Sequence, residues 1–572
     1  MTLERLSTDV LILGAGGAGL FAALHAKQAA PGLEVTVAVK GLLGKCGCTR
    51  MVQGGYNVAL APGDSVERHF MDTIEGGGWL NRQDLAWTLV TGAQKRIREL
   101  ELELGCFFDR NPDGTVHQKA FAGQSFDRTV HKGDLTGIEI MNRLAEQVWA
   151  RDIRRLEEHR AVALIPAKGD EGIAGALTID MRSGGFRLVT ARAVLLATGG
   201  GPTMYRYHTP SGDKSCDGMA MALRAGLSLR DMEMVQFHPT GLLAGAETRM
   251  TGTVLEEGLR GSGGFLLDGA GRRFMPDHDP RAERATRDIV SRAMFDRIRK
   301  GPTGPHGGLF IEMKHLGPER VRREFKGMVE RCADCGFDLA GGRVEVIPTA
   351  HYMMGGVEFE ADCRTALPGL WAAGEDTGGV HGANRLGGNG VANSTVFGGI
   401  AGDAIGLALA KAGGAPEPDL AAVEREIEQA RRPLGQGPRG DLEAIRERLY
   451  GTMWEDAGIV RDAEGLARAA RTLAELDAEL EATRIADGDL AFNLGWHDWL
   501  NLKNLVLTSR AIVAAAETRA DSRGAHFRAD FPETSPLAES RFTRVRWDGA
   551  RLALDTAPVQ FERIKPGQSL LT

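Results

Sequence analysis

Three glycines near the start of the chain have the spacing of a dinucleotide-binding loop. Gly14, Gly16 and Gly19 follow an apolar run at 10–13 and precede an Ala-rich helical pattern that continues from Leu20. A buried strand that turns into a helix through such glycines brings backbone N–H groups and a helix N-terminus close to a pyrophosphate. The spacing alone is a weak signal, but its position between strand and helix is the context that the motif requires. We therefore predict a bound dinucleotide, against the alternative of a glycine-rich turn without a ligand.

The elements around this motif predict a nucleotide-binding fold that is interrupted and then resumes. Periodicity predicts a strand at 34–39, helices at 84–104 and 136–151, and an apolar strand at 193–197 that runs into Thr198. The segment from about 233 to 346 is rich in Gly, Arg and aromatic residues, and a buried strand meets another glycine turn at 369–375. An α+β module is therefore expected to be inserted into the nucleotide-binding domain. Charged helical patterns fill 416–518, most clearly at 466–484, and a short β-like tail follows Phe531.

Composition and charge exclude several classes of function. The chain has 572 residues, 43% hydrophobic and 25% charged, which is ordinary for a globular protein of two or three domains. The net charge of −7 argues against nucleic acid as a partner, and no apolar run is long enough to predict a transmembrane segment. Seven cysteines without a secretory leader favour a reducing cytoplasm. Cys332 and Cys335 have no second pair at metal-binding spacing, so we predict no metal site.

Eight further motifs carry a family resemblance. They are Q-G-G at 53–55, D-G-M-A at 217–220, Q-F-H-P-T-G at 236–241, E-G-L-R-G at 257–261, T-R-D at 286–288, H-Y-M-M-G-G at 351–356, H-G-A-N-R-L-G-G-N at 381–389 and S-R-G-A-H at 522–526. With them the chain resembles the flavoprotein subunits of succinate dehydrogenase and fumarate reductase, and their relative L-aspartate oxidase, over nearly its whole length.

This resemblance implies the fold class and the domains. The expected fold is α/β, with a Rossmann-like FAD-binding domain, an inserted α+β capping domain and a C-terminal helical domain. The FAD-binding domain would occupy 1–235 and 347–414, the capping domain 236–346, the helical domain 415–530 and a C-terminal tail 531–572.

The resemblance also implies that the dinucleotide is FAD. The implied FAD-binding residues are Gly14, Ala15, Gly16, Gly17, Ala18, Gly19, Lys40, Cys48, Thr49, Gly54, Gly55, Thr198, Gly199, Asp217, Glu375, Arg385, Gly390 and Val391. Lys40 stands on the adenosine side, where a fold that grips a ribose hydroxyl usually offers an acid. Succinate dehydrogenases carry a His, covalently bonded to the flavin, where this chain has Cys48. A histidyl link is therefore excluded there, and we expect non-covalent FAD, with a cysteinyl thioether as the alternative.

The implied substrate site is a clamp for a small dicarboxylate beside flavin N5. His238, His351 and Arg385 match the family's carboxylate binders, and an Arg grips a carboxylate through two parallel hydrogen bonds. Phe121 matches a residue that packs over the middle carbons of the substrate and excludes water. Ordinary core packing is the alternative for Phe121, and a satisfied core histidine is the alternative for each His.

A proton relay is implied at the same site. Arg287 matches the family's proton donor, which is awkward because a guanidinium is a very weak acid. It can work only where another group re-protonates it at once, and Glu257 and Arg260 match that relay. Their i, i+3 spacing predicts that both lie on one helix face.

Glu256 departs from the family pattern. The family has Thr there, whose hydroxyl helps to hold a substrate carboxylate, and the loop between His238 and Glu257 is longer here. Two like charges about 4 Å apart at an effective dielectric near 20 repel by about 4 kcal/mol. Three arrangements avoid this cost. Glu256 points away while Thr251 or Thr253 supplies the hydroxyl, Glu256 is protonated, or the substrate carries a cationic or hydroxyl group at that end.

The leading prediction is an FAD-dependent oxidoreductase that exchanges hydride between flavin N5 and the CH–CH bond of a small dicarboxylate, succinate or fumarate first. The alternatives are an L-aspartate oxidase-like oxidation of an amino-dicarboxylate and an electron-transfer flavoprotein subunit of a larger complex. No iron–sulfur ligand set is present in the sequence, so an iron–sulfur subunit or another electron carrier is an expected partner. The expected location is the cytoplasm, with attachment at the inner face of the membrane through a partner as the variant.

Overall fold

A seven-stranded sheet carries the glycine loop. The computed structural model describes residues 3–169, 172–410, 413–485, 488–549 and 551–571, and its largest sheet has the order β6-β2-β1-β9-β8-β7, with β16 also paired to β9. These strands are β1 (Glu4–Leu13), β2 (Val35–Val39), β6 (Arg154–Glu157), β7 (His159–Pro166), β8 (Ile173–Asp180), β9 (Gly185–Leu196) and β16 (Leu370–Ala372). β16 joins the sheet in parallel with β9, although the two strands are far apart along the chain. The prediction that nucleotide-fold character resumes at 369–375 is thus confirmed.

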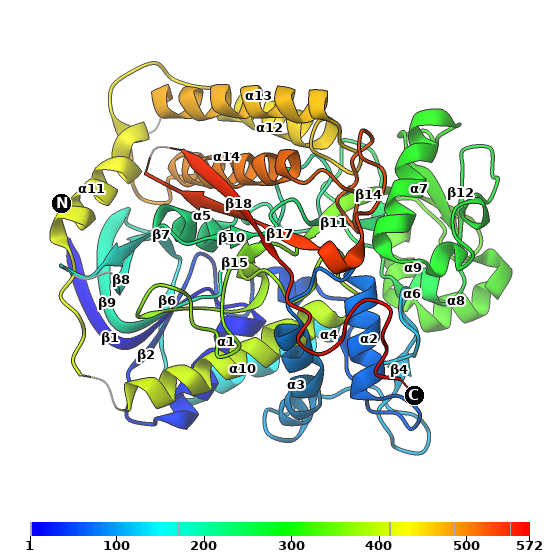
Figure 1. The fold of residues 1–572 in the computed structure, drawn as a ribbon, viewed down its shortest axis with the longest axis horizontal. Helices are drawn as coiled ribbons and strands as arrows, with labels where there is room; N and C mark the ends of the chain where they lie inside the picture. Colours follow the sequence, from blue (N-terminus) through cyan, green and yellow to red (C-terminus); the bar gives the residue numbers. More distant parts are fainter. Residues whose placement is uncertain (1–2, 170–171, 411–412, 486–487, 550, 572) are drawn as a thin grey trace.

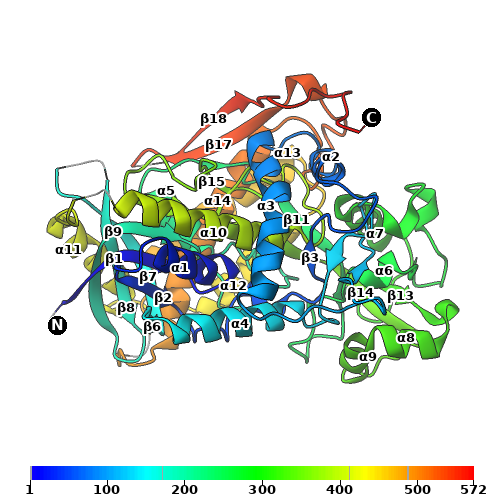
Figure 2. The ribbon, with the colours of Figure 1, turned by 90° about the horizontal axis from the view of Figure 1, so that it is seen from below.

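Two helices beside this sheet pack closely against each other. α1 (Gly17–Ala29) begins three residues before Leu20, where the helical pattern was expected to continue, and it lies beside α10 (Asn389–Leu409), as Figure 2 shows. A Cβ atom on Gly398 would lie 2.5 Å from the carbonyl oxygen of Ala18, and the neighbouring turn of α10 is equally tight. Glycines therefore set the distance between α1 and α10. The outer helices on this side are α2 (Val66–Gly76), α3 (Gln83–Leu102) and α4 (Thr136–Ala150), and α5 (Asp217–Arg224) lies at the other face.

The inserted module is a separate α+β layer, seen in green at the right of Figure 1. Its antiparallel sheet has the order β11-β14-β13-β12. The elements are β11 (Val235–Leu242), α6 (Gly258–Gly261), β12 (Phe265–Leu267), α7 (Arg287–Lys300), β13 (Leu309–Glu312), α8 (Pro318–Glu324), α9 (Lys326–Ala333) and β14 (Arg343–Met353). The chain enters through β11 and leaves through β14, which pair with each other. Both connections therefore lie together at the edge of the nucleotide-binding half.

Short strands line the seam between the two parts. A three-stranded sheet of order β3-β5-β4 is formed by β3 (Tyr56–Asn57), β4 (Gln118–Lys119) and β5 (Thr129–Val130). The 3-10 turn at Cys48–Met51 precedes it.

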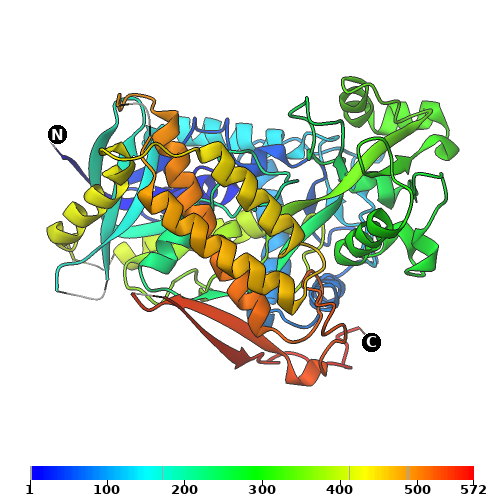
Figure 3. The same ribbon diagram turned by 90° about the horizontal axis from the view of Figure 1, so that it is seen from above.

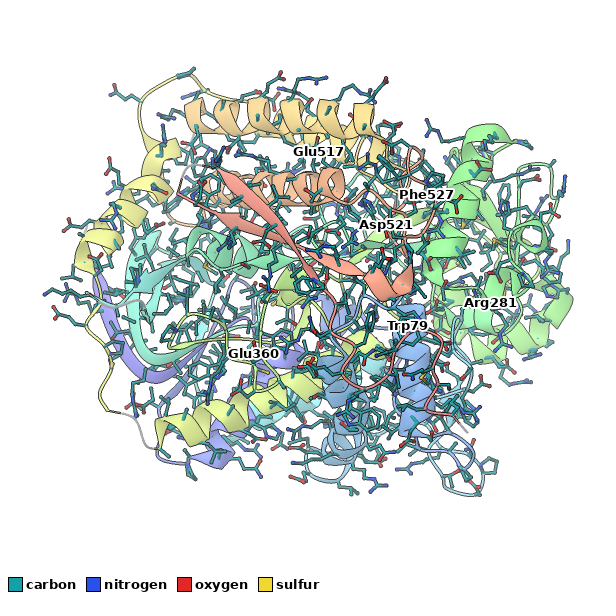
Figure 4. The ribbon with its side chains drawn as sticks, in the orientation of Figure 1. Trp79, Arg281, Glu360, Glu517, Asp521 and Phe527 are labelled. Atoms are coloured by element: carbon teal, nitrogen blue, oxygen red, sulfur yellow. The ribbon has the colours of Figure 1, made fainter. Side chains whose placement is uncertain are left out.

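The C-terminal helices form a layer on the far side of the sheet, as Figure 3 shows. They are α11 (Leu420–Arg431), α12 (Leu442–Glu455), α13 (Ala463–Ala482) and α14 (Leu494–Thr518). In α13, Leu466, Leu473 and Leu480 recur on one buried face, which is why its amphipathic pattern was legible in the sequence. Beyond α14, Phe527 lies against the inserted module, with the Arg292 guanidinium of α7 5.4 Å from its ring (Figure 4). Among the described residues, no helix combines the length and apolar character that crossing a membrane requires.

The C-terminal tail is not a detached hairpin. β17 (Arg541–Trp547) and β18 (Leu552–Pro558) pair with each other, and β17 also pairs with β10 (Leu229–Arg230) in a sheet of order β15-β10-β17-β18. β15 is Gly356–Val357. A two-stranded hairpin alone is only marginally stable in water, and here the buried Val545 and Phe542 join it to the nucleotide-binding half.

Candidate functional site

One continuous cavity of about 630 Å³ runs from the glycine loop to the inserted module. Gly14 and Gly16 line one end, and His238 and His351 line the other. Its size is in the range of cofactor and ligand pockets. The cavity brings together residues from both halves of the nucleotide-binding domain and from the inserted module.

The three glycines of the loop are required for different steric reasons. A Cβ atom on Gly14, whose φ is +110°, would overlap the carbonyl oxygen of Ala197 and lie 2.9 Å from the Cα atom of Thr198. A Cβ atom on Gly16 would meet only the Thr49 hydroxyl, at 3.6 Å. Gly19 was expected to line the cavity, but it does not, because it packs against the carbonyl of Gly14 behind the loop. The loop therefore presents bare backbone to the cavity, as a pyrophosphate cradle requires.

Two adjacent carboxyl groups hold the backbone at 198–201, of which Glu375 lines the cavity and Asp376 lies behind it. Asp376 accepts hydrogen bonds from the Thr198 backbone N–H, from Thr198 Oγ1 at 3.0 Å and from Gly199 N at 3.1 Å. Glu375 Oε1 accepts from Met353 N at 3.0 Å and from Gly201 N at 3.3 Å. Burial raises the pKa of Glu375 to about 7 and that of Asp376 to about 6, in spite of these bonds. The sequence analysis named Glu375 but missed Asp376, which fixes the Thr198–Gly199 turn.

The end of the cavity near Lys40, where the resemblance implies the adenosine side, is built around Asp217. Its carboxylate pairs with Lys40 Nζ at 2.9 Å and with Arg160 Nη2 at 3.1 Å, and it accepts from Asn504 Nδ2 at 2.6 Å. Burial would raise the pKa of Asp217, but Lys40 and Arg160 hold it far below its ordinary range. Arg160, on β7, was not predicted because its partner lies 57 residues further along the chain.

Another part of the cavity, where the resemblance implies the flavin ring, lies between the Cys48–Met51 turn and the N-terminus of α10. Cys48, Thr49, Gly54 and Gly55 line the cavity on one side, and Gly390 and Val391 line it on the other. Burial raises the pKa of the Cys48 thiol to about 12, so the thiol is protonated at neutral pH. The start of the 21-residue helix α10 adds the positive end of a helix dipole to this wall.

These features fit FAD. The loop of bare backbone, the polar adenosine end and the helix N-terminus follow one another along a single cavity of the right size. The residues would hold the pyrophosphate at the Gly14–Gly16 turn, the adenosine side near Asp217 and the ring system beside Gly390.

A buried ion cluster stands at the seam with the inserted module. Glu257 accepts from Arg287 through Nη2 at 2.7 Å and Nε at 3.2 Å, and from Arg260 Nη2 at 2.8 Å. Gln236 Oε1 accepts from Arg287 Nη1 at 2.9 Å. Burial raises the pKa of Glu257, but Arg287 and Arg260 outweigh it, so the carboxylate is ionised. Arg287 and Glu257 line the cavity, whereas Arg260 lies behind Glu257 and does not reach it.

Two neutral histidines face this cluster. The rings of His238 and His351 lie 5.3 Å apart between centroids. Burial, with the positive charge of Arg287, lowers the pKa of both well below the ordinary value. His238 Nδ1 accepts from the Thr240 backbone N–H at 3.3 Å, which leaves the ring proton on Nε2. Each ring is thus a hydrogen-bond partner without charge, kept neutral first by its burial and then by the cations around it.

Arg385 is a buried cation without a carboxylate partner among the residues that the structure describes. Its residue is 5% exposed, its Cζ lies 4.3 Å from the centre of the Tyr352 ring, and Nη1 makes one long bond of 3.4 Å to the Leu386 carbonyl. The Nε atom is buried and has no partner. Burial, together with the charge of Arg287, lowers the pKa of Arg385 to about 10. An uncompensated buried charge is expensive, so this group is arranged for an anionic ligand.

Glu256 lines the cavity but is not a bare charge. Its Oε2 pairs with Lys119 Nζ at 2.9 Å. Burial raises the pKa of Glu256, and the ammonium of Lys119 opposes that rise. None of the three arrangements considered in the sequence analysis includes this ion pair, because Lys119 lies on β4, 137 residues away along the chain.

Two other expected residues lie close by. Thr253 also lines the cavity, but its hydroxyl donates to the Met250 carbonyl. Phe121 lies beside Gly54, where a Cβ atom would overlap its ring.

Most of the expected residues therefore meet at one cavity. Gly19 and Arg260 stand directly behind it. Thr251 is not part of its lining, because its hydroxyl donates to the Gly245 carbonyl at 2.6 Å, and the others line it. The lining residues that sequence reasoning missed include Lys45, Gly47, Arg50, Asp134, His159, Ala161, Thr209, Lys214, Ser215, Arg331, Tyr352 and Ser394. Tyr352 lies inside the motif at 351–356, so that motif was a usable signal for it. His159 and Ala161 lie on a strand with no motif.

Comparison with known proteins gives consistent matches. A family model described as "FAD binding domain" matches residues 9–391, and one described as "Fumarate reductase flavoprotein C-term" matches residues 446–570. The fumarate reductase (CoM/CoB) subunit from Methanothermobacter marburgensis is 39% identical over 539 residues, 94% of this chain and 96% of that protein. The fumarate reductase flavoprotein subunit of Escherichia coli is 35% identical over 547 residues, 92% of this chain and 89% of that protein. A solved structure of an Escherichia coli quinol fumarate reductase variant has a TM-score of 0.93 at 32% identity and covers 99% of both chains.

Proposed function

Because this chain belongs to the fumarate reductase and succinate dehydrogenase flavoprotein family, and so is an FAD-dependent oxidoreductase that acts on a CH–CH bond, we propose that its cavity binds succinate or fumarate. Arg385 carries the proposal. A guanidinium that is buried without a carboxylate partner among the described residues is best explained by a carboxylate that arrives with the substrate. The comparisons favour this reading over oxidation of an amino-dicarboxylate.

The carboxylates of the substrate are assigned to three lining residues. Arg385 would grip one carboxylate, and the neutral His238 and His351 would donate hydrogen bonds to the substrate carboxylates. Phe121 would cover the middle carbons and keep water away. Polarising a carboxylate makes the attached double bond a better hydride acceptor, which is electrostatic stabilisation of the transition state.

Proton transfer is assigned to Arg287. When FAD is bound it supplies, or takes up, the hydride. Fumarate then needs a proton on the neighbouring carbon, and we assign Arg287, which lines the cavity, as its donor. An arginine that gives up a proton must recover it at once, and Glu257 touches both Arg287 and Arg260. We assign Glu257 and Arg260 as the relay through which a proton from the solvent reaches Arg287 in fumarate reduction, and through which the proton taken from succinate returns to the solvent in the reverse reaction.

The cofactor is proposed to be bound without a covalent link. Cys48 lies in the cavity wall, and its thiol is held protonated by burial, which disfavours attack on a ring methyl. Precipitation with acid should release all of the FAD into the supernatant. Yellow colour that stays with the precipitated protein would indicate a thioether instead, and Cys48→Ser would then abolish it.

The relatives named above are called subunits, and we propose that this chain also works with an electron-carrying partner, for example one that holds iron–sulfur clusters. A cytoplasmic position, peripheral to the membrane through that partner, follows from the same proposal. The domain limits at 236–346 and 415–530 are proposed on the entry and exit of the chain through β11 and β14 and on the run of helices after α10. A pull-down from the native host tests the partner.

The direct test uses purified holoprotein with artificial electron carriers. It should oxidise succinate with a dye acceptor and reduce fumarate with a reduced dye. Arg287→Ala should abolish both reactions while the protein keeps its FAD. Turnover in neither direction by the wild-type chain would refute the proposal, and peroxide release from L-aspartate in air would establish the amine-oxidising alternative.

A further inference from the structure

An ion pair at the substrate end of the cavity crosses the seam between the two parts of the molecule. Lys119 belongs to β4 in the nucleotide-binding half, and Glu256 immediately precedes Glu257 in the inserted module. The Glu256 side chain is 3% exposed and that of Lys119 is 17% exposed. Glu256 lines the cavity, whereas Lys119 stands behind it. The lysine therefore reaches the substrate only through the carboxylate that it holds.

The two oxygens of Glu256 are not equivalent. Oε2 accepts from Lys119 Nζ at 2.9 Å, while Oε1 has no hydrogen-bond partner within the described part of the chain. Lys119 also donates to the Gly133 carbonyl at 3.3 Å, so its ammonium is fixed in place from two sides. One oxygen of a carboxylate thus remains available to the cavity, with the charge of the group compensated from behind.

The charges around the proposed substrate position match a dianion only when Lys119 is counted. Arg287, Arg260 and Arg385 are cations of this region, and Glu257 and Glu256 are its carboxylates. Together with Lys119 these groups leave two positive charges, whereas without Lys119 they leave one. Asp134 and Arg331, which also line this end of the cavity, offset each other. His238 and His351 are neutral.

We propose that Lys119 is a specificity-determining residue that sets the affinity for a doubly charged substrate by holding Glu256 as an ion pair. This inference rests on the proposed function, because it concerns the dicarboxylate of the same site. Lys119 is a positioning residue, since it touches Glu256 and not the substrate position. A bare carboxylate at 256 would repel a substrate carboxylate, and the pair removes that repulsion.

The test measures dicarboxylate binding directly, from the change in flavin absorbance when malonate is added to the holoprotein, alongside KM and kcat for fumarate. Lys119→Met should weaken malonate binding and raise KM by at least about tenfold, while kcat falls by less than about threefold. The monocarboxylate crotonate should lose less affinity than malonate. Lys119→Arg should rescue binding because it keeps the charge.

Removing the carboxylate tests the same inference from the other side. Glu256→Gln should tighten malonate binding. The double variant K119M/E256Q should regain the malonate affinity that K119M alone loses. Lys132→Met is the matched control, because Lys132 is a half-exposed lysine of the same region that pairs with Asp109 outside the cavity. Its affinity for malonate should equal that of the wild type.

The outcomes separate the two proposals. If wild-type protein neither binds malonate nor reduces fumarate, the proposed function fails. If the wild type does both but Lys119→Met keeps wild-type affinity, or loses malonate and crotonate binding equally, the role of Lys119 is refuted. Should Lys119→Met fail to load FAD, Glu256→Gln still decides, because weaker malonate binding in that variant overturns the inference.

Discussion

Replacing Gly14 by Ala should strongly destabilise the nucleotide-binding half of the chain, whereas the same change at Gly16 should not. At Gly14 the added methyl would overlap the Ala197 carbonyl, and the residue has a φ of +110°. Backbone strain of this kind costs about 1–3 kcal/mol, and forcing an extra carbon into a packed position costs a similar amount of about 1–3 kcal/mol. The free energy of unfolding should therefore fall by about 2–6 kcal/mol, a large part of the 5–15 kcal/mol that is typical of a domain.

Gly16 supplies the matched control within the same motif. Its backbone is extended, with φ −78° and ψ −173°, and the nearest atom to an added methyl is the Thr49 hydroxyl at 3.6 Å. The apoprotein should keep its stability to within about 1 kcal/mol, because Ala also restricts the unfolded chain. FAD affinity should nevertheless fall, since that methyl enters the proposed pyrophosphate position.

The assay is urea unfolding of four apoproteins, the wild type and the Ala variants of Gly14, Gly16 and Gly19, followed by far-UV circular dichroism. FAD content is measured on the same preparations. Gly19→Ala should behave like Gly14→Ala, because its methyl would overlap the Gly14 carbonyl. Equal unfolding free energies for the Gly14 and Gly16 variants would refute the reasoning. Full FAD binding by Gly16→Ala would show that the loop is not the pyrophosphate cradle.

Four other perturbations have defined outcomes. Glu257→Gln should lower kcat by about 10²- to 10⁴-fold with FAD retained, because it breaks the proton relay, and wild-type turnover would count against that role. Arg128→Met leaves the buried Asp64 without its ion-pair partner and should cost about 3–5 kcal/mol in urea unfolding. Leu473→Ala, in the buried stripe of α13, should cost about 2–5 kcal/mol in the same measurement. Although burial lowers it, hydrogen bonds to acidic partners raise the pKa of His25 above its ordinary 6.5. The stability that His25 adds over His25→Gln should therefore be complete below about pH 6.5 and be lost as the pH rises through the raised pKa, and a difference that grows with pH would contradict this.

The sequence predicted those parts of the molecule whose signal is local. The strand, glycine turn and helix at the N-terminus, and the leucine stripe of α13, are legible because each pattern is written in consecutive residues. The inserted module was expected because nucleotide-fold character resumes at 369–375, and β16 does return to β9. Boundaries were less accurate, since β9 begins at Gly185 and not at 193.

What the sequence could not predict depends on partners that are distant along the chain. The charge of Glu256 was visible, but the lysine that compensates it was not, because nothing in one sequence marks residues 119 and 256 as neighbours. Asp376 and Arg160 escaped notice for the same reason. The two-residue strand β10 is too short to show any periodicity, and so the pairing of the tail with it was out of reach.

The sheet that joins β10 to β17 constrains how the protein is made. One strand of that sheet leaves the ribosome near residue 230 and its neighbour only after residue 541. The main sheet must likewise wait for β16 before its edge along β9 is complete. While more than half of the chain is being synthesised, β10 therefore lacks its partner strand β17. Unpaired strand edges of this kind favour aggregation. We expect the nascent polypeptide to depend on chaperones. A chain truncated before residue 541 should be synthesised but should not be recovered as soluble protein.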